Sequence, residues 1–354
     1  MTEPRVLVVG AGLAGALLAR RLQDAGAEAV LIGTAPDSPT GGYRDATAAS
    51  GGLVRAFEPE PAARALAAAS LAELRGDPGL AAEAGWRRTG SLYLLDPDTV
   101  AGGGGGGGVG AGAAAVDAEV LTAAEVARRF GVDGLPEHAV GVWERRAGHV
   151  VPDRLRRAVL AGLTRTEAVP MARLDGDTVE LRDGRRLAGD LVVVAAGAWT
   201  PGLLRAAGLA TCLRTKHIQY AHHAVRRADL PSFVDETSGL YGRPAGPGRL
   251  LLGLPSSRWD VDPAAPTPDA ELAARVRAVA ALRLPGLDPR PVGPPVSAAD
   301  CYSEPPGLAL RAVSGTVHTF TGGSGGAAKT ALAASRRAAS ALLDHPSSVG
   351  VPTG

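Results

Sequence analysis

Residues 5–32, RVLVVGAGLAGALLARRLQDAGAEAVLI, decide the fold of this chain. An apolar run typical of a buried strand passes through a G-x-G-x-x-G pattern into a helix rich in Ala, Leu and Arg, and a second apolar run follows. Gly10 permits a tight turn, Gly12 lets the backbone approach a pyrophosphate, and Gly15 allows the helix to pack closely on the strand. Free N–H groups at the helix start attract phosphate. The stretch therefore predicts a dinucleotide-binding βαβ unit, rather than a plain turn of an α/β core.

The end of the second strand departs from the usual pattern. Gly33 stands where an acidic residue commonly binds the adenosine ribose. Thr34 and Asp37 follow closely and are the candidates for that contact. We therefore expect the ribose to be held by a different group from the usual one.

Composition excludes several classes of protein. The chain has 354 residues, is 45% hydrophobic and carries a net charge of +1, so it can bury a large core in two domains or one interleaved pair. The absence of a basic run argues against nucleic acid or an anionic membrane as partner.

The sequence also bears on the location of the protein and on its cysteines. No run reaches the roughly 20 apolar residues of a membrane span, and the start lacks the basic residues of a signal peptide, so we expect a cytoplasmic protein. Cys212 and Cys301 are too few for a disulfide framework, and no metal site is predicted.

Lysine is almost absent from this chain. Of 37 basic residues only Lys216 and Lys329 are lysine, and a GC-rich genome explains most of the arginine bias. It does not explain why two lysines remain. Because an ammonium is compact and can lose its charge, whereas a guanidinium is planar and always charged, we expect both lysines to lie in constrained sites.

The order of segments predicts two interleaved domains. Strand-like runs at 91–95 and 139–143 flank a helix near 123–130, and residues 213–253 are again rich in strands. The apolar strand at 190–197 returns the chain to the first domain, as in flavin-type nucleotide domains. We expect a nucleotide-binding domain in residues 1–88, 146–212 and 296–354, and a mainly antiparallel β-sheet domain in residues 89–145 and 213–295.

Two more loops of small residues suit a flat ligand. ATAASGG, residues 46–52, lets the backbone approach such a ligand closely. GGSGGAA, residues 322–328, feeds the start of a final Ala-rich helix, where the helix dipole favours negative charge. Beside an isoalloxazine ring, the second loop would stabilise the charge of the reduced flavin.

With these segments in this order, the chain resembles the D-amino-acid-oxidase-like superfamily of FAD amine oxidoreductases, and its monomeric sarcosine oxidase branch in particular. The resemblance covers nearly all of the chain and includes the segments 148–152 and 195–199. It implies an α/β fold in which a Rossmann-type FAD-binding domain is interleaved with a mainly antiparallel β-sheet substrate domain. It implies FAD contacts at Gly10, Gly12, Leu13, Ala14, Gly15, Thr47, Ser50, Gly51, Gly52, Val169, Ala196, Gly197, Trp199, Cys301, Gly322, Gly323, Ser324 and Gly325.

The resemblance also implies roles for individual side chains. Lys329 corresponds to a lysine that pairs with the substrate carboxylate, and Arg55 is a second candidate for this pairing, unless it is a surface ion-pair residue. Cys301 falls where the sarcosine oxidase branch attaches FAD covalently through a thioether; the alternative is a small buried hydrophobic residue. Tyr241 would line the substrate side, although a buried tyrosine is as often plain packing.

The chain departs from that branch where the branch activates oxygen. Leu251 replaces a lysine above the flavin, and Pro255 replaces a histidine. An aromatic residue expected two places after Cys301 is Ser303, with Tyr302 shifted by one. Lys216 could take over the oxygen role, or it could clamp the cofactor or the domain interface.

We therefore predict FAD-dependent oxidation of a C–N bond in an amino acid, an N-substituted amino acid or a cyclic imino acid, by hydride transfer to flavin N5 to give an imine. The substrate partner is a small-molecule amine, and the electron acceptor is oxygen or another acceptor. The alternative is a dehydrogenase of a biosynthetic pathway that does not use oxygen, which Leu251 favours. A flavin monooxygenase and a flavoprotein without catalysis are weaker alternatives.

Overall fold

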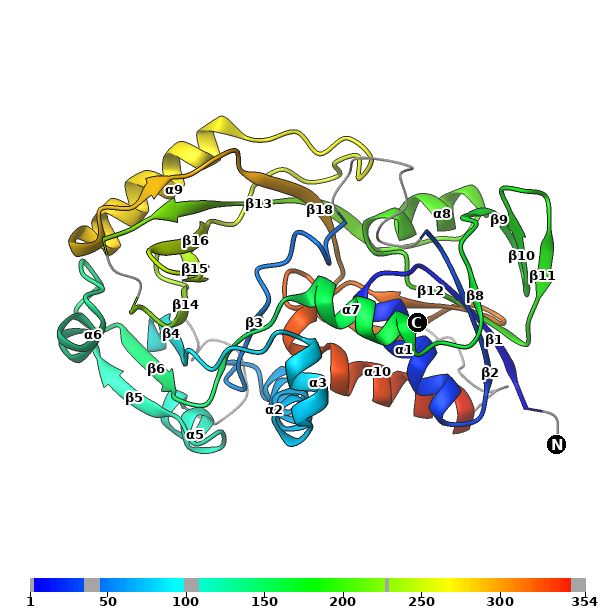
Figure 1. Ribbon diagram of the computed structural model, residues 1–354, viewed down its shortest axis with the longest axis horizontal. Coiled ribbons are helices and arrows are strands. Elements are labelled where there is room, and N and C mark those ends of the chain that lie inside the picture. The colour runs from blue at the N-terminus through cyan, green and yellow to red at the C-terminus, as the bar shows by residue number, and fades with distance from the viewer. Residues whose placement is uncertain (1–2, 35–44, 99–107, 227–228, 345–354) are drawn as a thin grey trace.

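The parallel sheet predicted from residues 5–32 forms one side of the molecule (Figure 1). The computed structural model describes residues 3–34, 45–98, 108–226 and 229–344; Asp37 lies outside them. Among these residues the sheet has six strands in the order β19-β20-β12-β1-β2-β8, and every neighbouring pair is parallel except β19 with β20. Its strands are β1 (Arg5–Val9), β2 (Glu28–Ile32), β8 (Thr166–Glu167), β12 (Leu191–Val194), β19 (Ala309–Ser314) and β20 (Val317–Thr321).

Both faces of this sheet are covered, which explains why β1 and β12 read as unbroken apolar runs. Val6 and Val8 point to a helical layer, whereas Leu7 and Val9 point to the opposite face. The helical layer consists of α1 (Leu13–Asp24), α2 (Pro61–Gly76), α7 (Pro152–Ala161) and α10 (Ala327–Asp344). The opposite face is covered by α8 (Thr200–Ala206) and an antiparallel sheet of β9 (Met171–Asp175), β10 (Thr178–Leu181) and β11 (Arg186–Ala188).

A second, larger sheet forms the other side of the molecule (Figure 1). Within the described residues it has nine strands, of which eight lie in the order β17-β13-β16-β15-β14-β4-β6-β5, while β18 pairs with β13. All its pairs are antiparallel except β14 with β4. The strands are β4 (Ser91–Leu95), β5 (Glu119–Thr122), β6 (Val140–Glu144), β13 (Arg214–Ala224), β14 (Ser232–Asp235), β15 (Tyr241–Pro244), β16 (Arg249–Gly253), β17 (Arg290–Pro291) and β18 (Val296–Tyr302).

Short helices and one strand pair complete the described fold. α6 (Ala123–Phe130) begins at a capping box, in which Thr122 and Glu125 satisfy each other's backbone N–H groups. α9 (Ala270–Arg283) packs on the apolar face of the larger sheet through Leu272 and Val276. The remaining helices and strands of the described residues are β3 (Leu53–Val54), α3 (Pro78–Glu83), α5 (Val109–Ala114), β7 (Gly148–His149) and two short 3-10 helices, η1 (Gly197–Trp199) and η2 (Pro285–Leu287). No helix in the described part of the chain is long and apolar enough to cross a membrane.

The predicted fold class is confirmed: a Rossmann-type parallel sheet is combined with a mainly antiparallel second sheet. The chain enters the second sheet at β4 and again at β13, and it returns along β18, which pairs with β13 over Arg214–Tyr220. The proposed division into domains at particular residues stays a prediction.

Gly15 should be indispensable for the fold because of the contact between α1 and the turn before it. A Cβ at Gly15 would lie 2.0 Å from the carbonyl oxygen of Gly10. We expect Gly15→Ala to lower the free energy of unfolding by about 3 kcal/mol, in the manner of an overpacked core. The measurement is urea denaturation followed by far-UV circular dichroism. Gly76→Ala is the control, because a Cβ there meets no atom within 4 Å, and it should be neutral or slightly stabilising. Equal stabilities of the two variants would contradict this account of the turn.

Candidate active site

A cavity of about 750 Å³ lies between the two sheets, beyond the carboxyl ends of β1 and β12. Ligands of open α/β sheets bind at this edge, where the chain leaves the strands for helices on either face. Three predicted loops line the cavity: the turn around Gly10–Leu13, the loop around Thr47–Gly52 and the turn around Gly323–Ala328. The sheet of β13, β15 and β16 contributes Tyr220 and Tyr241 to the cavity wall.

The turn before α1 is shaped for close approach of a ligand. Gly10 has φ +122°, and a Cβ there would lie 2.5 Å from the carbonyl oxygen of Ala195. By contrast, a Cβ at Gly12 would meet only the hydroxyl of Thr47, at 3.5 Å, so this glycine leaves room on the cavity side. The Thr47 hydroxyl accepts a hydrogen bond of 3.0 Å from the backbone N–H of Leu13. The loop and the helix start are therefore held together around the predicted phosphate position.

The loop of residues 46–52 is fixed from behind. Gly52 has φ +67°, its N–H donates to the Ser50 hydroxyl at 3.1 Å, and its carbonyl accepts from Val150 N–H at 2.9 Å. A Cβ at Gly52 would lie 2.2 Å from the Val150 carbonyl oxygen. This close packing explains why the segments 46–52 and 148–152 occur together in the sequence.

The turn before α10 is built differently from what the sequence suggested. The N–H of Ser324 donates to the carbonyl of Cys301, that of Gly325 to the carboxylate of Asp300, and that of Gly326 to the carbonyl of Gly323. These N–H groups are thus already engaged within the chain. The positive end of α10, at Ala327 and Ala328, is the part of this turn that can favour a negative charge in the cavity.

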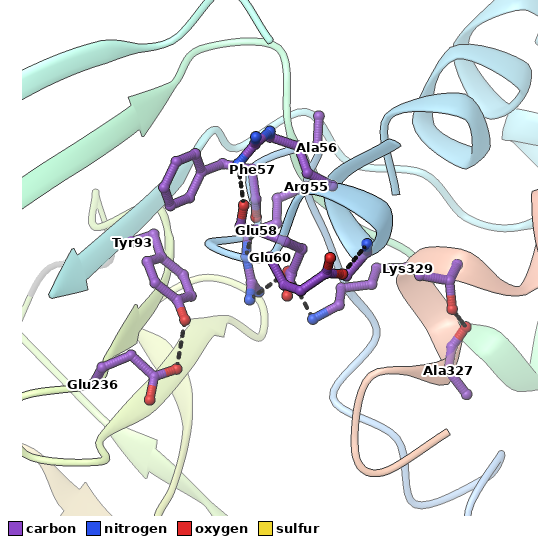
Figure 2. A network of polar contacts seen from close by, with 12 residues as sticks. Arg55, Ala56, Phe57, Glu58, Glu60, Tyr93, Glu236, Ala327 and Lys329 are labelled. Atoms are coloured by element: carbon purple, nitrogen blue, oxygen red, sulfur yellow. Dashed lines mark hydrogen bonds and ion pairs between the residues drawn. The ribbon is translucent and has the colours of Figure 1, made fainter. Parts of the chain in front are cut away.

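Lys329 and Arg55 meet at one buried carboxylate, as Figure 2 shows. Oε1 of Glu58 lies 2.7 Å from Nζ of Lys329 and 2.8 Å from Nη2 of Arg55. Arg55 also donates from Nε to the Phe57 carbonyl at 3.1 Å, and its guanidinium lies 4.6 Å from the ring centre of Tyr93. Lys329 and Arg55 both line the cavity, so the predicted pair of cations is brought together there.

The electrostatics of this cluster follow from burial and proximity. Burial and the positive charge of Arg55 lower the pKa of Lys329 to about 8, although Glu58 opposes the change. Burial favours the neutral acid in Glu58, but the two cations overcome it and hold its pKa below the usual value. At neutral pH the cluster of these three side chains therefore carries a net charge of +1.

Several functional candidates were not identified from the sequence. Glu58 has no motif that marks it, and neither does Glu236, which lines the cavity and accepts a hydrogen bond of 2.7 Å from the Tyr93 hydroxyl (Figure 2). Burial raises the pKa of Tyr93, which keeps this hydroxyl a donor. Arg182 lines the cavity beside Pro170 and Met171. Thr34, which the sequence did offer as a candidate for the ribose contact, also lines it. Acidic and basic residues of these types are scattered along the chain, so only the fold selects the ones that meet here.

Tyr241 and Lys216 are placed in different surroundings. Tyr241 lines the cavity, and its hydroxyl donates to the Gln219 carbonyl at 3.1 Å. Lys216 is not among the cavity-lining residues: its Nζ lies 4.6 Å from the ring centre of Trp259 and 5.1 Å from that of Tyr302. Burial lowers the pKa of Lys216. This placement supports a structural clamp better than contact with a ligand.

Cys301 lies on the wrong face of β18 to reach the cavity. Its neighbours Asp300 and Tyr302 line the cavity, and adjacent residues of a strand point to opposite faces. The Cys301 side chain is 1% exposed and packs in the core with Leu213 and Val317. Burial raises the pKa of its thiol to about 11, which disfavours the nucleophilic thiolate. The alternative role, a small buried hydrophobic residue, describes this placement, and the implied thioether finds no support in it.

The other predicted FAD contacts divide into two groups. Residues that line the cavity are Gly10, Gly12, Leu13, Ala14, Thr47, Ser50, Gly51, Gly52, Ala196, Gly197, Trp199, Gly323, Ser324 and Gly325. Gly15, Val169 and Gly322 lie behind the lining. Gly15 packs against Gly10, Val169 against the core, and Gly322 against Ser303.

This arrangement fits a dinucleotide with a flat redox ring. The cavity combines a glycine turn at the N-terminus of α1, a loop of small residues at 46–52 and the start of a second helix, α10. These features define the class of a dinucleotide-dependent redox enzyme built on a Rossmann-type sheet.

Comparison with known proteins gives the family. The model of the family "DAO: FAD dependent oxidoreductase" matches residues 5–341, and the chain belongs to this family. It is therefore an FAD-dependent oxidoreductase, as the resemblance in its sequence implied. A glycine oxidase of Pseudomonas aeruginosa is 29% identical over 310 residues, which cover 81% of this chain and 80% of that protein.

Solved structures agree on the fold. L-proline dehydrogenase from P. horikoshii is 17% identical and superposes with a TM-score of 0.77, covering 98% of this chain and 95% of that one. NikD, an unusual amino acid oxidase essential for nikkomycin biosynthesis, is 21% identical with a TM-score of 0.72, covering 99% and 96%.

Removing the shared carboxylate should destabilise the protein strongly. Glu58→Gln would leave the buried charges of Arg55 and Lys329 without their counterion, so we expect a loss of about 3–5 kcal/mol in the free energy of unfolding. Urea denaturation followed by tryptophan fluorescence measures it. Glu60→Gln is the matched control, because exposed Glu60 only caps α2, and it should cost about 1 kcal/mol. A cost for Glu58→Gln no larger than for Glu60→Gln would show that the cluster is not held by Glu58.

Proposed function

We propose that this enzyme oxidises a C–N bond of an amine that also carries a carboxylate: an amino acid, an N-substituted amino acid or a cyclic imino acid. The observation that carries the proposal is the pair of cations, Lys329 and Arg55, on the wall of the FAD cavity. Glu58 bridges the two cations, and Glu236 lies within electrostatic reach of both. A substrate carboxylate that enters the cavity would find two charge-assisted hydrogen-bond donors side by side. The names of the similar glycine oxidase, proline dehydrogenase and amino acid oxidase are consistent with such substrates.

The protein groups would each have a defined task. Lys329 and Arg55 bind and orient the carboxylate, and a bound carboxylate favours the charged form of Lys329. Tyr220 and Tyr241 give the opposite wall an aromatic, poorly hydrated surface, which favours the uncharged amine. The start of α10 offers its positive end to the side of the cavity where Gly323 lies.

When bound, FAD would supply the redox chemistry, hydride transfer from the carbon that bears the amine to flavin N5, and the product would be an imine that water can hydrolyse. Four carboxylates among the described residues line the cavity: Asp45, Asp235, Glu236 and Asp300. Asp45 and Asp235 pair with arginines, and Asp300 accepts from two backbone N–H groups. We therefore assign to Glu236, which accepts from the Tyr93 hydroxyl, the task of taking up the amine proton. The proton on the nitrogen must leave before the hydride does, since a neutral amine is the better hydride donor.

The electron acceptor is either oxygen or another acceptor. Leu251 occupies the position where the sarcosine oxidase branch has a lysine, and its side chain is completely buried. Lys216 lies outside the cavity lining, so it does not replace that lysine there. These two placements favour the alternative function, a dehydrogenase that passes electrons to an acceptor other than oxygen.

We further propose that FAD is bound without a covalent link, because the Cys301 thiol points into the core. We expect acid precipitation of the purified protein to leave the yellow colour in the supernatant. Cys301→Ser should bind the same amount of flavin, apart from a loss of stability from placing a hydroxyl in the core. Colour that stays with the wild-type pellet and is lost from the pellet of Cys301→Ser would contradict this proposal.

The carboxylate site can be tested by comparing matched substrates. Amino acids, N-methyl amino acids and cyclic imino acids should bleach the flavin under anaerobic conditions, whereas the corresponding amines without a carboxylate should not. In Lys329→Met, flavin content should be unchanged while the KM of the acids rises about a hundredfold or more, the effect of losing one partner of a buried charge pair. Lys216→Met is the control and should keep the preference for acids.

The KM of the acids should depend on pH through the protonation of Lys329. Because the pKa of Lys329 in the folded protein is about 8, the ammonium is present below that pH and is lost above it. We therefore expect the KM of the acids to rise above about pH 8 in the wild type, and this rise to be absent in Lys329→Met. An unchanged KM in Lys329→Met at neutral pH would refute the assignment.

A further inference from the structure

A second cleft lies behind the FAD cavity, on the same face of the larger sheet. In the antiparallel ladder, Leu251 of β16 stands directly opposite His222 of β13 and Arg243 of β15. Directly opposite residues share a face, and so do residues two positions further along, which here are Tyr220 and Tyr241. The tyrosines line the FAD cavity, whereas His222 and Arg243 line the second cleft. One sheet face thus lines two compartments, the FAD cavity at the row of Tyr220 and Tyr241 and the second cleft at the row of His222 and Arg243, with buried Leu251 between the last two.

The lining of the second cleft is basic. Arg87, His149, His222 and Arg243 line it together with Thr89 and the turn of residues 244–248. In the described part of the chain no Asp or Glu lines the cleft. The pKa of His149 is lowered to about 4 by burial and by the charges of Arg243 and Arg87, which places both guanidinium groups within electrostatic reach of this ring. His149 is therefore a neutral ring near two cations.

Arg243 is the central element of this cleft. Its Nε donates to the Gly51 carbonyl and its Nη1 donates to the Pro244 carbonyl at 2.8 Å. Neither Arg243 nor Arg87 forms an ion pair with any described carboxylate. Arg243 is partly buried in the cleft wall, and burial lowers its pKa. A cation that is partly withdrawn from water without a counterion loses solvation energy, which an anion bound in the cleft would restore.

We propose that this cleft binds a phosphate group, with Arg243 and Arg87 as its charged ligands and Thr89 and His149 as neutral ones. Two guanidinium groups can each offer a planar pair of N–H donors, which match the oxygens of a phosphate. The Thr89 hydroxyl, which lies 3.0 Å from the Ser232 hydroxyl and 3.5 Å from Nδ1 of His149, adds a further polar group. Because Arg243 also holds the carbonyl of Gly51, the ligand would touch the loop that lines the FAD cavity from behind.

Equilibrium dialysis of the FAD-loaded enzyme against radiolabelled inorganic phosphate, at constant ionic strength, tests the proposal. The wild type should bind one equivalent in a saturable manner. Arg243→Met should weaken binding at least tenfold, since it removes charge-assisted hydrogen bonds. Arg249→Met, on the same hairpin but outside the cleft lining, should bind like the wild type.

Two further variants keep the result interpretable. Arg87→Met should also weaken phosphate binding, and because the Arg87 side chain is exposed, it should do so without a change in stability. Lys329→Met should bind phosphate like the wild type, whatever its effect on amine oxidation, because Lys329 lies in the other compartment. AMP in place of inorganic phosphate identifies the source: tighter binding of AMP indicates a nucleotide phosphate, and equal or weaker binding indicates a free phosphate.

Three results would overturn the proposal. They are no saturable binding by the wild type, equal losses in Arg243→Met and Arg249→Met, and loss of binding in Lys329→Met with retention in Arg87→Met. The last would place the anion in the FAD cavity.

Discussion

One shared carboxylate determines how the active site of this enzyme is assembled. Glu58 comes from the segment between β3 and α2, and Lys329 from the first turn of α10, so their contact fixes the C-terminal helix against the N-terminal part of the chain. Arg55 completes the cluster from the end of β3. Each buried cation would be costly alone, and Glu58 contacts both of them. The cluster thus stabilises the fold and holds two cations on the cavity wall, where we propose that a substrate carboxylate binds.

Much of the fold could be predicted from the sequence because its periodicity is local. The unbroken apolar run of β1, the G-x-G-x-x-G turn and the later strand β12 predict a parallel sheet buried on both faces, and the structure has one. The strand-like run at 91–95 and the strand-rich region 213–253 likewise predict strands of a second sheet, and the structure has β4 and β13 there. These signals depend on neighbouring residues only, so they do not require knowledge of the tertiary structure.

The site was less predictable, because its residues depend on strand phase and on long-range pairing. Cys301 and Tyr302 are adjacent on one strand, so only one of them can face the cavity. The resemblance could not predict which one it is. In the structure Tyr302 faces the cavity and the Cys301 thiol lies in the core. Glu58 and Glu236 are two among 36 acidic residues, and only the packing of α10 and β14 selects them.

The rarity of lysine was informative in a limited way. It marked Lys329, in a buried ion cluster, and Lys216, between two aromatic rings, but it did not tell which one meets the ligand.

The positions of the cations around the cavity bear on which molecule accepts the electrons from the reduced flavin. Among the cavity-lining residues that the structure describes, the cations are Arg55 and Lys329 beside Glu58, and Arg182 beside Pro170 and Met171. Buried Leu251 is not among the cavity-lining residues: it lies directly between His222 and Arg243 in the sheet, and both of these line the second cleft. Reduction of oxygen to superoxide creates a negative charge, and a cation beside the reacting oxygen would stabilise it. Among the described residues, the wall formed by Tyr220 and Tyr241 holds no such cation. This arrangement supports the alternative proposed above, an amine dehydrogenase that passes its electrons to an acceptor other than oxygen.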